Sequence, residues 1–479
     1  MTTGSRQLNT DQMSSQRNYY ALLTSLFFVA MAVFAVVFAK ERFQADGAYY
    51  LLKIINYGEF QVEHQRYILA VSQALPLLGS KLGFSMNTIF ILNSLNNVVF
   101  FYLVFLYAVY FLKDKTAGVA IILFSVFGVL HIQFTPMYEI WYGIILLVLV
   151  RAHMVQGRTI FMSDLLLLGA IMITVLFSHP LLFIPLLFVI MFEAIETWRI
   201  QWRLFFCIVI VFVSWYMVKK LFLSSYEAGK MGMLNTTWNE AYKDLFHPGY
   251  YWKLCKYFFT YYTIPMIAYL LCMGYYIFRK ALGKMVLLSV FLAGHILLIN
   301  FTHVMDWGQS PYFERMYMPI IPIIFLPFLY DFFTQLALRN MAGGILLVLI
   351  VAWRMWLFTD LGFFYKEHTA HAEEAIEAAQ KLPGSKFELH PDDFAGCMKY
   401  TDWSFTMESI LRSSAIDKSH TVTICTWEDF MEHDNRNRLN GNDYMLRRWE
   451  VMPDYAVNEN YFHIRDGKYV QLRPVCGNK

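Results

Sequence analysis

Charged residues are scarce in this sequence: Asp, Glu, Lys and Arg together make up 16% of 479 residues. Soluble domains carry about a quarter, whereas hydrophobic residues here reach 57%. The net charge of +3 is small and spread over loops, so no basic surface for nucleic acid is predicted. The composition therefore predicts a polytopic helical protein that is surrounded by membrane lipids.

Metal-ligand patterns of cysteine are also missing. The six cysteines are scattered, and none has the CxxC or Cys/His spacing of a metal site. Three of them lie in or beside apolar runs and three in the C-terminal region. The cysteines therefore predict neither a metal centre nor a disulfide framework.

Long apolar runs fill the first three quarters of the chain. Residues 1–18 are polar and predict a disordered cytoplasmic lead, and the apolar run 19–39 is too long for the core of a signal peptide. The run 67–82 has about sixteen residues, too few for a span, and contains Pro76 and Gly79; we interpret it as interfacial. About eleven spans are then expected, at 20–39, 88–112, 116–134, 138–155, 161–178, 181–197, 203–222, 253–278, 284–303, 314–336 and 341–359.

The distribution of Lys and Arg predicts the orientation. With residues 67–82 at the interface, the short loops on one side hold ten basic residues and those on the other side hold only Arg315. Because short cytoplasmic loops are rich in Lys and Arg, the N-terminus is expected inside. The layout and the absence of an endoplasmic-reticulum retrieval tail favour a bacterial inner membrane. The ten residues are Lys113, Lys115, Arg151, Arg158, Arg199, Arg203, Arg279, Lys280, Lys284 and Arg339.

The composition changes after residue 360. Acidic residues separated by Ala predict a helix that ends at Pro383 and Gly384. Short β-like runs follow at 386–390, 421–425, 461–465 and 469–472. We therefore expect a transmembrane domain at 19–359 and a small extracytoplasmic α+β domain at 360–479, to which no chemistry is assigned.

One acidic residue stands out in the first outer loop, residues 40–87. Asp46 follows the first span by about seven residues and precedes Tyr49, Tyr50 and further apolar residues. These predict a helix that lies flat at the interface. A helix cap or a solvated acid is the ordinary structural interpretation of Asp46. A carboxylate held in a pocket at this place can instead take a proton from an acceptor hydroxyl.

Three stretches resemble the GT-C superfamily of glycosyltransferases that use lipid-phosphate sugars, including the protein mannosyltransferase and aminoarabinose transferase group. The first is the acidic residue and Tyr-Tyr after the first span, and the second is Tyr138 with Glu139 at the start of a later span. The third, residues 315–322, is similar to an Arg-Tyr-x-x-Pro-x-x-Pro pattern with one residue inserted. The resemblance covers about residues 20–340 as a layout.

The resemblance implies a reaction. A sugar would move from a polyprenyl-phosphate donor to a lipid, glycan or protein acceptor on the extracytoplasmic face, with Asp46 as general base and Arg315 on the donor phosphate. Glu139 lies where related enzymes carry another acid. The remaining candidates for substrate binding are Tyr49, His64 and Arg66.

Other interpretations stay open at this point. Glu139 can be a simple helix-start charge, and Arg315, Arg66 and His64 can be interface anchors. Some members of the superfamily bind a metal through a DxD pair, and this pair is missing around Asp46. No cofactor is therefore expected. A divalent metal is possible but is not indicated by the sequence. The rival functions are a transporter or flippase of a lipid-linked glycan and a non-catalytic scaffold subunit. Transporters usually place charged residues near the middle of the membrane, whereas the polar residues here gather on one side; this favours a reaction at the membrane surface over transport.

Overall fold

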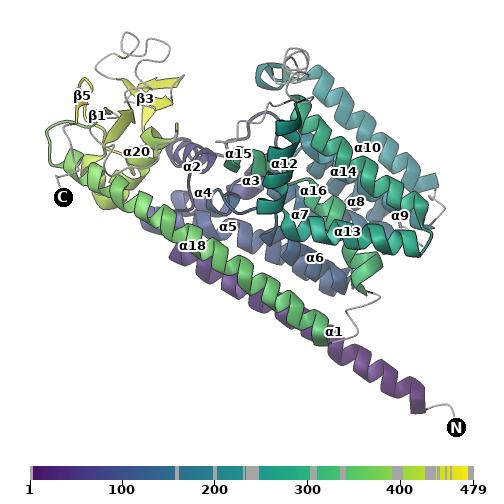
Figure 1. The fold of residues 1–479 in the computed structure, drawn as a ribbon. Coiled ribbons are helices and arrows are strands. Elements are labelled where there is room, and N and C mark those ends of the chain that lie inside the picture. Colours follow the sequence, from purple (N-terminus) through teal and green to yellow (C-terminus); the bar gives the residue numbers. More distant parts are fainter. Residues whose placement is uncertain are drawn as a thin grey trace.

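The computed structural model describes residues 4–156, 161–197, 202–229, 232, 247–302, 310–334, 341–390, 403–426, 439, 443–447, 450–453 and 456–472. A body of helices forms most of the molecule, and a smaller lobe near the C-terminus contains the strands (Figure 1). Helix α2 (Asp46–Tyr57) lies between the two parts (Figure 1).

The body contains most of the helices of the described residues. They are α1 (Gly4–Val37), α5 (Met86–Leu106), α6 (Lys115–Val126), α7 (Glu139–Gln156), α8 (Met162–Leu176), α9 (Phe183–Thr197), α10 (Trp202–Leu221), α12 (Pro248–Tyr261), α13 (Thr263–Phe278), α14 (Leu282–Thr302), α15 (Ser310–Tyr317), α16 (Ile320–Pro327) and α18 (Met341–Gln380). The π-helical turns η1 (Tyr107–Phe111) and η5 (Phe328–Phe333) extend α5 and α16, and η2 (Ile132–Phe134) and η4 (Pro180–Leu182) are short 3-10 turns.

Five helices within the described residues are long and apolar enough to cross a membrane. They contain the segments Tyr20–Val37, Met86–Phe111, Trp202–Leu221, Leu282–Thr302 and Gly343–Gln380. The pair α12 and α13 adds a sixth if it is one broken span. Three further apolar helices have only 10–17 residues. The prediction of an integral membrane protein made of helices is confirmed, while the number of eleven spans stays a prediction.

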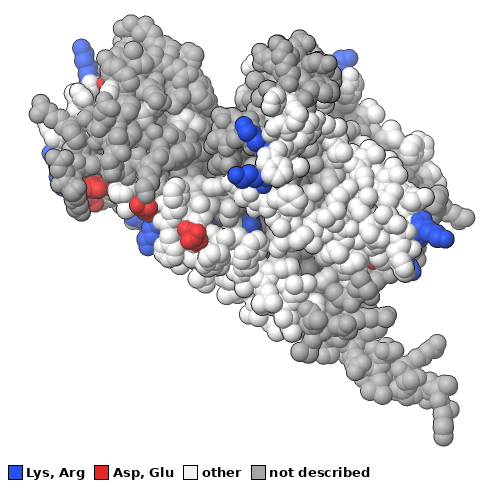
Figure 2. Space-filling model, viewed as in Figure 1, with Lys and Arg blue, Asp and Glu red and all other residues white. Residues whose placement is uncertain are grey.

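The outer surface of the helical body has the character of a surface in contact with lipid. Helix α10 exposes Phe205, Phe206 and Ile210, each more than half accessible. Figure 2 shows that the visible face of the body carries few charged residues. Helix α7, in contrast, is buried on all sides from Glu139 to His153. This agrees with its sequence, because a helix with apolar residues on every side is normally buried. We therefore take α7 as the centre of the body.

The expected span at 253–278 is wrong as a single helix. The structure has two helices, α12 and α13, that meet at Tyr262 with a bend of 98°. Pro265 explains the break, because its ring has no N–H to donate to the carbonyl of Tyr261, four residues earlier.

Two helices extend past the predicted ends of the transmembrane domain, whose bounds stay a prediction. Helix α1 begins at Gly4 and so includes most of the predicted lead at 1–18. Helix α18 continues through residue 360 to Gln380, so no break separates the last span from the outer region. Helices α1 and α18 lie side by side (Figure 1). Their approach is close at Gly362, where an added Cβ would lie 2.6 Å from the Phe38 ring.

The first outer loop forms short helices. Besides α2 it contains α3 (Ile68–Ser72) and α4 (Ala74–Lys81), which have five and eight residues. A helix needs about twenty residues to cross a membrane, so neither of these can span it. The interfacial interpretation of residues 67–82 agrees with this structure.

The C-terminal lobe is a small α+β unit. It contains α20 (Phe405–Ile416), η6 (Lys418–His420), β1 (Lys386–Leu389), β2 (Thr423–Thr426), β3 (Asp443–Arg447), β4 (Glu450–Pro453) and β5 (Val470–Gln471). Strand β1 lies between β2 and β5 with parallel pairing, and β3 pairs with β4 in antiparallel fashion. The predicted strand at 461–465 is wrong, since these residues form a turn and an irregular segment. Its Phe462 contributes to the apolar contact between the lobe and the outer loop.

Candidate functional site

Asp46 lies in a tight turn at the start of α2. The carbonyl of Gln44 accepts a hydrogen bond from Gly47 N–H at 2.9 Å, and Ala45 has φ 48° and ψ −119°. These angles match the second position of a type II′ turn, where glycine is strongly preferred. The Asp46 side chain is 36% exposed. The turn therefore presents a carboxylate that a hydroxyl group in solvent can approach.

Arg315 meets Asp46 from the opposite wall. Its Nη1 lies 3.0 Å from Asp46 Oδ2, although the two residues are 269 positions apart in the chain. The guanidinium also lies 5.1 Å from the centre of the Tyr138 ring, within the range of a cation–π contact. The prediction that Arg315 faces Asp46 agrees with this geometry.

A second ion pair stands beside the first. Arg66 Nη1 donates to Glu139 Oε1, and the two side chains are 14% and 5% exposed. Burial alone would lower the pKa of Arg66, but the neighbouring Glu139 carboxylate outweighs it, and the net shift is upward. Glu139 is also the first residue of α7, where the helix dipole favours a negative charge. Arg66 therefore stays charged in the site.

Tyrosines surround the two ion pairs. Burial raises the pKa of Tyr50, and the negative charges of Glu139, Glu63 and Asp46 act on the same phenol. Burial likewise raises the pKa of Tyr312 to about 12, with Arg315 acting in the opposite direction. These phenols stay neutral at pH 7, so they offer hydroxyl groups and aromatic faces to a ligand. Aromatic walls with a few charges are typical of ligand sites.

Tyr49 contacts other residues of the first outer loop. It is 2% exposed, its hydroxyl donates to Glu63, and Lys53 Nζ donates to it at 2.8 Å. Residues 46 and 49 are three positions apart in α2, so both lie on the same side of the helix, about one turn apart. In this structure Tyr49 supports the loop, and its predicted role in substrate binding stays untested.

His64 lies on the side of Arg66. Its ring stacks on Tyr226 at 4.3 Å, and its Nδ1 is 3.3 Å from Ser224 Oγ. Burial and the nearby Arg66 charge lower the pKa of His64, so its ring is neutral at pH 7. Both His64 and Gln65 have positive φ, near 54° and 60°, which is unusual for side chains of this size. The loop that carries Arg66 is thus held in a strained conformation.

Sequence reasoning missed a buried polar cluster beneath the turn. Arg42 is fully buried and donates to three neutral partners: Gln133 O at 2.6 Å, Ser94 O at 2.6 Å and Asn97 Oδ1 at 3.3 Å. Burial lowers the pKa of Arg42 to about 9. The signal was present in the sequence, because the otherwise apolar span of α5 contains Asn93, Ser94, Asn96 and Asn97. Polar residues within a span often mark a functional region.

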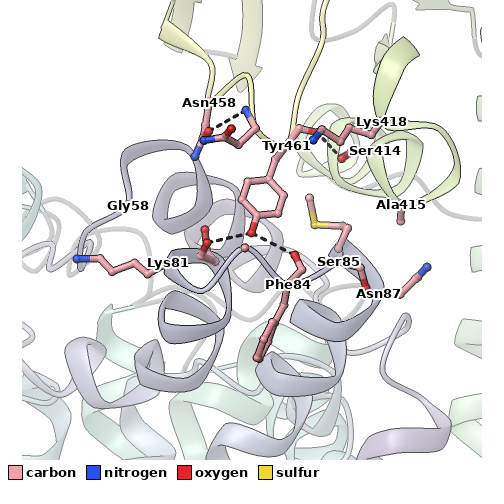
Figure 3. A pocket seen from close by; sticks show the side chains of 14 residues that line it. Gly58, Lys81, Phe84, Ser85, Asn87, Ser414, Ala415, Lys418, Asn458 and Tyr461 are labelled. Carbon is pink, nitrogen blue, oxygen red and sulfur yellow. Dashed lines mark hydrogen bonds between the residues drawn. The ribbon is translucent and has the colours of Figure 1, made fainter.

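The charged site is separate from a pocket of about 640 Å³ at the other end of α2. Residues of the outer loop and of the C-terminal lobe line this pocket, among them Gly58, Lys81, Phe84, Lys418 and Tyr461 (Figure 3). Within the described part of the chain, no group of three or more His, Cys, Asp and Glu residues could hold a metal ion.

Comparison of the chain with protein-family models, with curated proteins and with solved structures finds no match. The case for a function therefore rests on the residues that meet at Asp46 and on their geometry.

Proposed function

We propose that the protein is a membrane glycosyltransferase that moves a sugar from a polyprenyl-phosphate donor to a hydroxyl of a lipid, glycan or protein. The observation that carries the proposal is the meeting of Asp46 with Arg315, beside Arg66 and Glu139. Three distant stretches of the chain supply these residues, since Asp46 and Arg66 share the first outer loop. The arrangement provides a base for the hydroxyl and two guanidinium groups for a phosphate, as the reaction requires.

The proposed reaction is a substitution at the anomeric carbon of the sugar. The acceptor oxygen forms a bond to that carbon while the bond to the phosphate oxygen breaks, and polyprenyl phosphate leaves. Asp46 takes the proton of the acceptor hydroxyl. Arg315 binds Asp46 at 3.0 Å. A donor phosphate would compete for this guanidinium, and the carboxylate would then be free to act as a base. No cofactor takes part in this proposal.

The proposed orientation places this chemistry on the extracytoplasmic face of a bacterial inner membrane, with the N-terminus in the cytoplasm and eleven spans. The charges at the two ends of α7 support this orientation. Glu139, at the start of the helix, belongs to the candidate site on the proposed outer side. Arg151, about 18 Å further along the helix, lies on the proposed inner side and pairs with Glu193 at 2.7 Å. The basic residues expected in the cytoplasm include Arg151 and Lys284, and Lys284 pairs with Asp331 at 2.8 Å.

Replacing Arg315 by Ala is expected to weaken donor binding by about 10- to 150-fold, the equivalent of about 1.5–3 kcal/mol for a hydrogen bond to a charged group. The measurement is a titration of the purified protein with a short-chain polyprenyl-phosphate sugar, followed by tryptophan fluorescence. Arg279→Ala removes an exposed arginine and serves as the control. Donor affinity equal to that of the wild type would remove Arg315 from the phosphate site.

The experiment that tests the proposed function compares cells with the wild-type chain, with Asp46→Asn and with a deletion. Mass spectrometry of lipid-linked and surface glycans identifies any sugar that is lost from an acceptor. The proposal predicts loss of the same sugar in both altered strains, at normal levels of the variant protein. Accumulation of a lipid-linked intermediate in the deletion strain alone, with a normal pattern in Asp46→Asn, would favour a transporter or a scaffold.

A further inference from the structure

We propose that the C-terminal lobe positions the catalytic carboxylate, with Ser404 and Asn458 as positioning residues at the two ends of α2. This inference rests on the proposed role of Asp46 as the general base. The sequence gives the lobe no chemistry of its own. In the structure, however, it contacts the helix that begins with Asp46 at both ends.

The contact at the first turn of α2 is a hydrogen bond to the residue before Asp46. Ala45 N–H donates to Ser404 Oγ at 3.1 Å, and the Ser404 hydroxyl donates its own proton to Glu408 Oε1 at 3.1 Å. The hydroxyl proton therefore points to Glu408 and leaves the oxygen free to accept from Ala45. Ser404 and Glu408 are both fully buried. Their geometry fixes the amide of Ala45.

The fixed residue is the strained one. Ala45 has φ 48° and ψ −119°, a conformation that is unfavourable for a non-glycine residue. Such a conformation persists only where the surroundings enforce it. The Ser404 contact supplies part of this constraint, because it holds the amide plane that defines the turn. Without it, the turn is free to relax and to move the Asp46 carboxylate.

Further charges of the lobe support the same segment. Arg412 donates to Glu408 Oε2 at 3.3 Å, and its guanidinium lies 4.5 Å from the centre of the Phe43 ring. Its charge also acts on Glu41, whose pKa burial raises. Glu408 thereby links Ser404 and Arg412, and these residues contact the chain on the N-terminal side of Asp46.

The contact at the last turn of α2 uses Asn458. Its side-chain amide donates to Ile55 O at 2.8 Å, and its backbone N–H donates to Asn56 Oδ1 at 2.7 Å. Next to it, the Tyr461 hydroxyl donates to Ser80 O at 2.9 Å and fixes the lobe to α4 (Figure 3). Because both ends of α2 are bound to one lobe, the helix cannot rotate or slide without moving the lobe.

The test is a double-mutant cycle of Ser404→Ala with Ala45→Gly. Ser404→Ala alone is expected to lower the turnover number by about 10- to 100-fold, since a displacement of about 1 Å can cost as much as 100-fold. Donor affinity is expected to stay the same. Glycine adopts the turn without strain. In the Ala45→Gly background, Ser404→Ala should therefore lower turnover by less than about threefold, a rescue that a purely structural role for Ser404 does not predict.

Hydrogen exchange gives a readout that does not need the reaction. Exchange of amides in a peptide covering residues 40–50 is expected to increase in Ser404→Ala and to stay unchanged in Ser419→Ala, which removes an exposed hydroxyl from the same lobe. Asn458→Ala, at the other end of α2, is the second variant and is expected to lower turnover by about threefold.

Equal losses of turnover in both Ala45 and Gly backgrounds, or unchanged exchange at residues 40–50 in Ser404→Ala, would overturn the positioning role. A wild-type protein that transfers no sugar while Ser404→Ala still increases exchange at these residues would instead contradict the proposed function. The two failures are therefore distinguishable.

Discussion

Asn in place of Asp46 is expected to lower the turnover number of sugar transfer by about 100- to 10,000-fold, the usual contribution of a general base. The amide has the shape of the carboxylate and can still accept a hydrogen bond from Arg315, but it cannot take the proton of the acceptor hydroxyl. The side chain is 36% exposed, so the change should leave the fold intact. The measurement is transfer from a labelled donor by purified protein at saturating donor.

Donor binding is the internal check on this variant. Removing the carboxylate takes away the partner that holds Arg315 before the donor binds. Donor affinity should therefore be unchanged or higher in Asp46→Asn. Glu59→Gln, an exposed acid in the same outer loop, is the matched control and is expected to transfer sugar at the wild-type rate. A normal turnover number in Asp46→Asn would rule out Asp46 as the base.

Removing the carboxylate of Glu139 is expected to produce the largest loss of stability. Glu139→Ala leaves the Arg66 guanidinium, 14% exposed, without this acid, and breaking a buried pair in this way costs about 3–5 kcal/mol of the free energy of unfolding. The measurement is a denaturant titration of the purified protein. Lys40 and Glu373 form a more exposed pair, and Glu373→Ala is the control, with an expected loss below about 1 kcal/mol.

A double variant, with both Arg66 and Glu139 replaced by Ala, separates the contribution of the ion pair to the free energy of unfolding from that of side-chain packing. If the cost arises from an unpaired buried charge, the double variant should be more stable than the sum of the two single losses predicts. Additive losses, or a loss below about 1 kcal/mol in Glu139→Ala, would show that the two residues are not energetically coupled.

Local residue patterns could predict the charged residues of the candidate site. Asp46 after the first span and Arg315 before a Pro-rich span are visible as exceptions in a chain with few charges. The structure brings them within 3.0 Å of each other. Arg66 and Glu139 also appeared as separate candidates, but their direct pairing is a tertiary contact between residues 73 positions apart, and no local pattern encodes it.

The residues that support Asp46 could not be predicted from local sequence patterns. Ser404 is one of many serines in a polar region, and only the packing of α20 against α2 brings it to Ala45, which is 359 positions away. The strain at Ala45 was equally hidden, because an alanine normally indicates no turn. Arg42 is different, because the polar residues of α5 in an apolar span are a visible signal of a buried polar cluster, although this signal was not used to predict the site.

In the fold, too, some features follow from local sequence patterns and others depend on tertiary contacts. Apolar runs located the helices well, because the length and hydrophobicity of a helix are local properties. Their ends and bends were less predictable. Helix α18 continues past residue 360 to Gln380, because the next proline is Pro383. Gly362, within the helix, permits close packing on Phe38. The bend between α12 and α13 lies beside Pro265, within a largely apolar run.

The most direct test of the central claim is the fate of the donor in proteoliposomes. These would contain the purified wild-type protein, a labelled polyprenyl-phosphate sugar and a mixture of candidate acceptors. A transferase breaks the bond between sugar and phosphate, so the account predicts that free polyprenyl phosphate and glycosylated acceptor appear in equal amounts, and that Asp46→Asn forms neither at a comparable rate. Intact donor that merely changes leaflet, at equal rates in both proteins, would contradict the account.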